Sequence, residues 1–164
     1  MTKLFLVLHI LAVIVAIGPV AVAASMFPPV ARRRLAEPGP GAAEAGAQLR
    51  LLHRICQVYA LAAVAVPVLG MGVAGMMKVT GDTWVVVSIV LTIIAAVVLG
   101  ALVLPRQGAL LAESDPAPAE GGAGAGVGVV KRTKQLAMYT GIFNLLWAAV
   151  TIIMIVRPGS SLNH

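Results

Sequence analysis

A single histidine, His9, lies within an almost unbroken apolar run near the start of the chain, LFLVLHILAVIVAIGPV. An imidazole is ionisable near neutral pH and is the commonest protein ligand of metal ions. An ionisable side chain inside a lipid-soluble segment is a functional candidate by default. We therefore take His9 as the first candidate site residue, a ligand of haem or of a metal ion such as copper.

Methionines recur at similar depths in other apolar runs. If His9 lies roughly 8 Å inside the end of its helix, Met71, Met76 and Met154 lie at or near that depth on other helices. Imidazole and thioether groups together suit haem iron or a soft copper ion. The competing interpretation is a neutral histidine that hydrogen-bonds to a neighbouring helix and binds no cofactor. The sequence favours the second interpretation, because methionine is common in apolar cores.

The other candidate groups add no second ligand at this depth. His53 belongs to the opposite end of its helix, nearly a bilayer thickness from His9. Cys56 is the only cysteine, so one chain can form neither a disulfide nor a thiolate metal cluster. No Asp, Glu, Lys or Arg lies deep in an apolar run, which disfavours ion-coupled transporters and channels. No residue is assigned a catalytic role, and a non-enzymatic function is favoured.

Composition places these residues in a lipid bilayer. The chain has 164 residues, 60% hydrophobic and 11% charged, with a mean hydropathy of +0.99. A soluble domain carries about 25% charged residues, so this chain cannot cover itself with a polar surface. We expect one integral membrane domain over 1–164. The net charge of +6 is typical of membrane loops here and does not predict nucleic-acid binding.

Four runs are long enough to cross the hydrocarbon layer as helices, which takes about 20 apolar residues each. They cover about 4–26, 55–77, 84–104 and 136–156. The predicted fold class is therefore all-α, a transmembrane four-helix bundle.

Prolines and loop composition predict where these helices end. Pro28 and Pro29 are expected to end the first helix and Pro105 the third, and Pro67 to kink the second. The connections at about 35–45 and 113–130 are rich in Ala, Pro and Gly and are predicted to be flexible cytoplasmic loops.

Loop charge predicts the orientation. Nine of the twelve Lys and Arg residues lie in the two long connections or beside them, and three lie on the other side. The positive-inside rule then places both termini outside and the long loops in the cytoplasm. The stretch AVAAS at 21–25 resembles a signal-peptidase site. The arginines at 32–34 favour the opposite orientation to a secretory signal, and hence a retained helix.

Small and polar residues within the runs predict helix packing. Gly70, Gly72 and Gly75 would let a neighbouring helix approach closely. Asn144 is expected to make an interhelical hydrogen bond, and Pro67 to shape its helix.

Three stretches carry a family resemblance: LFLVLHILAVIVAIGP, LHRICQVYALAAVAVPVLGMGVAG and YTGIFNLLWAAVTIIMIVRPG. Together they resemble a bacterial family of small four-span predicted integral membrane proteins of unknown function. The LHIL element also looks like the first span of the copper resistance protein D group and of HemJ-type protoporphyrinogen oxidases, which bind haem. That resemblance implies His9 as the haem or metal ligand. The chain departs from it by lacking a basic residue buried in a span and a matched second histidine.

Two functional hypotheses follow. The first is a non-catalytic helix-packing or accessory component of a bacterial inner membrane, whose partners are the lipid bilayer and either its own copies or a membrane complex. The second is a haem- or copper-binding redox or metal-handling protein that uses His9. A small-solute transporter is a third and weaker alternative. High Ala, Gly, Val and Arg usage is typical of GC-rich bacterial genomes.

Overall fold

The computed structural model describes residues 2–36, 41–114 and 125–158. The described residues are almost entirely helical and contain no strand. The elements are α1 Thr2–Ala36, α2 Ala42–Ala62, α3 Ala65–Met77, α4 Thr83–Val97, the π-helix η1 Val98–Val103, α5 Leu104–Ser114 and α6 Ala125–Val156. They form four helical runs long and apolar enough to cross a membrane: Thr2–Leu35, Ala42–Met77, Thr83–Glu113 and Gly128–Val156. The all-α, four-span prediction is confirmed.

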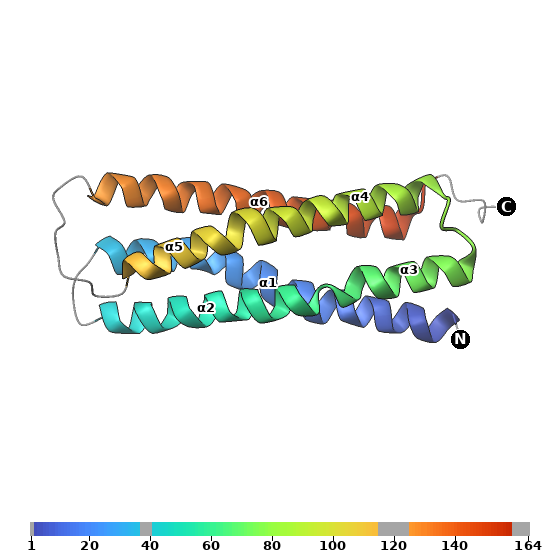
Figure 1. Ribbon diagram of the computed structural model, residues 1–164, viewed down its shortest axis with the longest axis horizontal. Coiled ribbons are helices and arrows are strands. Elements are labelled where there is room, and N and C mark those ends of the chain that lie inside the picture. The colour runs from blue at the N-terminus through green and yellow to red at the C-terminus, as the bar shows by residue number, and fades with distance from the viewer. Residues whose placement is uncertain (1, 37–40, 115–124, 159–164) are drawn as a thin grey trace.

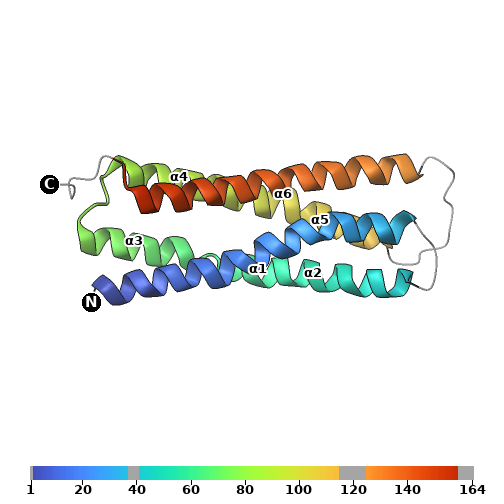
Figure 2. The same ribbon diagram turned by 180° about the vertical axis from the view of Figure 1, so that it is seen from behind.

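The four runs lie antiparallel in an elongated bundle (Figures 1 and 2). The start of α1 and the end of α6 lie at one end of the bundle, beside the α3–α4 connection. The end of α1, the start of α2, the end of α5 and the start of α6 lie at the other end, which we call the arginine-rich end. Helix α1 packs against α2, α3 and α6, and α4 packs against α6.

The first helix does not end at Pro28 and Pro29, as the sequence predicts, but continues to Ala36. Each proline lacks an N–H, so the carbonyls of Ala24 and Ser25 lose their helical donors. Phe27, at 0% exposure, is buried in the same turn. Burial of this segment against other helices therefore outweighs the local penalty of the prolines.

The third run likewise does not end at Pro105, because α5 continues it to Ser114. The turn before Pro105 is the π-helix η1, in which the N–H of Leu104 bonds to the carbonyl of Leu99. In a regular α-helix the proline ring would clash with the carbonyl of Ala101, and the bond from Leu104 to Leu99, five residues back, makes this turn wider than an α-helical one. The helix can then continue and bury Gln107 and Leu110.

The second run is interrupted where Pro67 predicts a kink. Helix α2 ends at Ala62 and α3 begins at Ala65. Pro67 cannot donate to the carbonyl of Ala63, which instead accepts from the N–H of Val66 at 3.1 Å. The chain bends within two residues and continues as a helix.

The predicted flexible loops fall partly outside the described residues, at 37–40 and 115–124. Their described parts belong to helices, which extend all four runs beyond the apolar segments at the arginine-rich end. Two contacts join α5 to α6: Arg132 pairs with Glu113, and the Arg106 guanidinium lies 4.4 Å from the centre of the Tyr139 ring. The basic residues are therefore held on helices at this end.

Candidate functional site

His9 lies in a contact between α1 and α3. The side chain is buried, at 7% exposure. A Cβ atom on Gly70 would lie only 3.0 Å from the Cε1 of the ring, so the imidazole packs directly on the glycine. The Nδ1 of the ring is buried without a hydrogen-bond partner among the described residues. The absence of a side chain at Gly70 makes room for the imidazole.

The structure does not bring the predicted methionine partners together around His9. Met71 is 55% exposed and Met76 is 44% exposed, so both face the surroundings of the bundle. Met154 is half-buried and packs beside the cluster that contains Trp84 and Val85. Within residues 2–36, 41–114 and 125–158, no group of three or more His, Cys, Asp or Glu residues is placed to hold a metal ion.

A haem ligand needs open space at one ring nitrogen and a flat cavity beside it. On the side of the ring that faces α3, a Cβ on Gly70 would lie 3.4 Å from Nδ1 and 3.6 Å from Nε2 of His9. The contact with Gly70 therefore leaves no space for a haem between the imidazole and this turn of α3.

The glycines predicted for packing divide into two groups. Gly70 and Gly72 face α1, where Gly72 would contact Phe5 at 3.8 Å through a Cβ. Nothing lies within 4 Å of the corresponding position at Gly75, and Pro67 is exposed. The close approach of α1 to α3 therefore depends on Gly70, whereas at Gly72 a Cβ would make an ordinary van der Waals contact.

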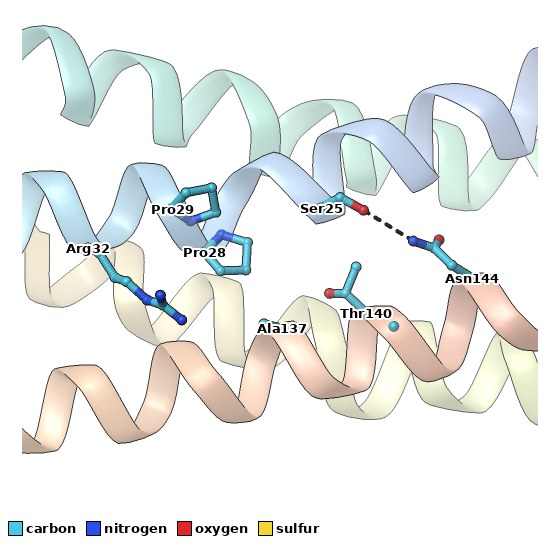
Figure 3. Close-up of a pocket in the computed structure, with 8 residues that line it drawn as sticks. Ser25, Pro28, Pro29, Arg32, Ala137, Thr140 and Asn144 are labelled. Atoms are coloured by element: carbon cyan, nitrogen blue, oxygen red, sulfur yellow. Dashed lines mark hydrogen bonds between the residues drawn. The ribbon is translucent and has the colours of Figure 1, made fainter.

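A pocket of about 210 Å³ lies between α1 and α6, toward the arginine-rich end (Figure 3). Helix α1 lines it with Ser25, Pro28, Pro29 and Arg32. Helix α6 lines it with Ala137, Thr140, Gly141 and Asn144. We call this the α1/α6 pocket.

Three hydrogen bonds hold the polar side chains around the pocket. Asn144 donates through Nδ2 to the hydroxyl of Ser25 at 3.1 Å, which is the interhelical bond that the sequence predicts for this asparagine. Ser25 in turn donates to the carbonyl of Ala21 at 2.7 Å. At the other end of the pocket, the Nε of Arg32 donates to the hydroxyl of Thr133 at 3.2 Å.

Thr140 differs from the other hydroxyl residues in the spans. A hydroxyl in a helix commonly donates to the carbonyl four residues earlier, and five side chains of the described spans do so: Ser25, Ser88, Thr92, Thr133 and Thr151. Thr140 is 3% exposed, and its Oγ1 is buried with no partner among the described residues. Its hydroxyl is therefore available to a molecule in the α1/α6 pocket that it lines (Figure 3).

Of the residues that line this pocket, the sequence predicts hydrogen bonds for Asn144 and Thr140, between helices or, for the threonine, back to its own helix, and it does not predict the pocket. A signal for the others is present in the spacing. Ser25, Pro28 or Pro29, and Arg32 recur at three- to four-residue intervals, and Ala137, Thr140 or Gly141, and Asn144 do the same. Such spacing puts each set on one helix face. That these two faces meet could be learned only from the fold.

A second polar cluster joins α2 to α5. The Nδ1 of His53 lies 3.1 Å from the Oε1 of Gln107, and the Nε2 of Gln107 donates to the Sγ of Cys56 at 3.6 Å. Gln107 and Cys56 are both fully buried. Because an amide oxygen only accepts, the imidazole must donate to it. This chain of bonds satisfies the Gln107 amide inside the bundle and holds the two helices together.

Comparison with protein-family models, with curated proteins and with solved structures found no match to this chain.

Proposed function

We propose that this chain is a non-catalytic integral membrane component that works through contacts between its helices and other membrane-spanning helices, from its own copies or from a membrane complex. The observation that carries the proposal is the position of His9. This ionisable residue, the strongest candidate for chemistry in the sequence, is packed as a contact residue against Gly70. Its burial serves the approach of two helices.

The outer surface of the bundle is apolar and can contact other membrane-spanning helices. Large apolar side chains face outward from every run, including Ile14, Leu61, Ile93 and Leu145 at 58–77% exposure. Such a surface is compatible with lipid tails and equally with the apolar face of another helix.

Single-cysteine crosslinking in native membranes tests this proposal. Cys56 is the only cysteine and is fully buried, so a Cys56→Ala background has no thiol that could crosslink. Cysteines placed singly at Ile14, Leu61, Ile93 and Leu145 then sample the outer face of each run. We expect oxidative crosslinks, either between copies or to another membrane protein, to concentrate on one face. Trp147→Cys, at a buried position, serves as the matched control. Uniform absence of crosslinks at all four exposed positions would contradict the proposal.

Protein purified from the same membranes tests the alternative of a redox or metal-handling protein. A stoichiometric Soret band or copper content in the purified protein, lost in His9→Ala, would replace the present proposal with that one.

We further propose that the membrane is a bacterial cytoplasmic membrane with the arginine-rich end toward the cytoplasm. The charge asymmetry and the composition support it. Cysteines at Arg33 and Lys78, both exposed, provide the test in the Cys56→Ala background. A membrane-impermeant thiol reagent should label position 78 in intact spheroplasts and position 33 only after lysis. The reverse pattern would invert the orientation.

A further inference from the structure

We propose that the α1/α6 pocket binds an anionic phospholipid of the surrounding bilayer, with its phosphate at Arg32 and an ester carbonyl at Thr140. This inference is independent of the helix-contact role proposed above.

The polar groups of the pocket are ordered along the bundle axis. Arg32 lies at the arginine-rich end, and Ser25 and Asn144 pair at the deeper end. Seven residues separate Arg32 from Ser25, which is about 10 Å along a helix. Thr140 lies one turn from Asn144 on the side of Arg32. A ligand entering from the headgroup region meets first a guanidinium and then a hydroxyl.

Arg32 supplies the site for an anionic group. Its Nε donates to the hydroxyl of Thr133 on α6, and its side chain points toward α6 (Figure 3). The terminal guanidinium nitrogens have no hydrogen-bond acceptor among the described residues, and the residue is exposed. A guanidinium fixed through Nε keeps its other donors for a phosphate, with which it forms short, charge-assisted hydrogen bonds.

Thr140 supplies the second contact. Its hydroxyl is buried and unpartnered among the described residues, and an unsatisfied buried donor destabilises the protein. An ester carbonyl is an acceptor and satisfies it. The unpartnered Oδ1 of Asn144 is an acceptor and would repel an anion, but it lies at the deeper end, away from Arg32.

The walls of the pocket select an amphiphile that reaches it from the bilayer. Pro29, Ala137 and Gly141 are exposed on the outside of the bundle, so the pocket opens laterally toward lipid. Its apolar rings and small side chains suit the glycerol and first methylenes of an acyl chain. A free phosphate ion would use Arg32 but would leave these walls and Thr140 without a partner.

Native mass spectrometry of the full chain, released from nanodiscs of phosphatidylcholine with phosphatidylglycerol, tests the proposal by counting retained lipids. We expect phosphatidylglycerol to be retained in preference to phosphatidylcholine. Arg32→Gln should lower that preference about tenfold, since it removes charge-assisted hydrogen bonds. Thr140→Val, which keeps the shape and removes the hydroxyl, should lower the retention of phosphatidylglycerol itself about threefold and leave the preference unchanged, because both lipids carry the ester carbonyl.

Two matched variants separate a built site from general charge and fold. Arg33→Gln removes the neighbouring exposed arginine, which does not line the pocket, and Thr151→Val removes a hydroxyl of α6 that bonds to its own helix. Both should retain the lipid like the unmodified protein. Equal losses in Arg33→Gln, no preference for the anionic lipid, or retention of inorganic phosphate with no lipid would each overturn the proposal. If Arg32→Gln fails to fold, the comparison of Thr140→Val with Thr151→Val still decides it.

Discussion

Replacing Phe27 by alanine is expected to lower the free energy of unfolding by about 3–5 kcal/mol, the range for truncating a fully buried aromatic residue. Phe27 is among the largest fully buried side chains of the described bundle, at 0% exposure. It lies directly before Pro28 and Pro29, where α1 has lost two helical hydrogen bonds. Its truncation therefore removes packing from the segment that depends on it most. Reversible unfolding in mixed micelles, followed by circular dichroism, measures the change.

The neighbouring Met26 provides the matched control. It is 44% exposed on the same helix turn, so Met26→Ala removes a lipid-facing side chain and should change the free energy of unfolding by less than about 1 kcal/mol. Equal losses in the two variants would show that α1 does not depend on Phe27 for its continuation past the prolines.

The four spans could be predicted from the sequence because the physics that fixes them is local. A backbone segment in lipid must satisfy its own hydrogen bonds, so each apolar run of sufficient length becomes a helix. The ends of the helices are harder to predict from the sequence than the spans. Pro28 and Pro105 carry strong local stop signals, yet burial of Phe27 and the π turn before Pro105 carry both helices onward. These compensations involve residues from other helices, or an unusual turn, and no local rule contains them.

For the candidate site, too, one part could be predicted from the sequence and another could not. Depth along a helix can be counted from the sequence, and it placed His9 and Met71 at a similar level. Rotation about the helix axis cannot be counted in this way, because consecutive residues point about 100° apart. In the structure the ring of His9 packs on Gly70, whereas Met71, the next residue, is exposed. Likewise, the α1/α6 pocket exists because two particular faces meet, and the sequence alone leaves the neighbour of each face open.

The contact between His9 and Gly70 yields the second large effect. Gly70→Leu is expected to destabilise the protein by about 1–3 kcal/mol, since even the Cβ of the new side chain would approach Cε1 of His9 to 3.0 Å. Gly75→Leu is the matched control on the same helix. Nothing lies within 4 Å of its Cβ position, so the free energy of unfolding, measured in mixed micelles, should change little.

A double-mutant cycle shows whether His9 itself is the obstacle. In a His9→Ala background the imidazole is gone, so Gly70→Leu should lose much of its cost, with a coupling energy of about 0.5–3 kcal/mol. Additive effects of the two substitutions would mean that the leucine meets some other group and that His9 does not set the distance between α1 and α3. In that case the interpretation of His9 as a helix-contact residue, on which the proposed function rests, would fail with it.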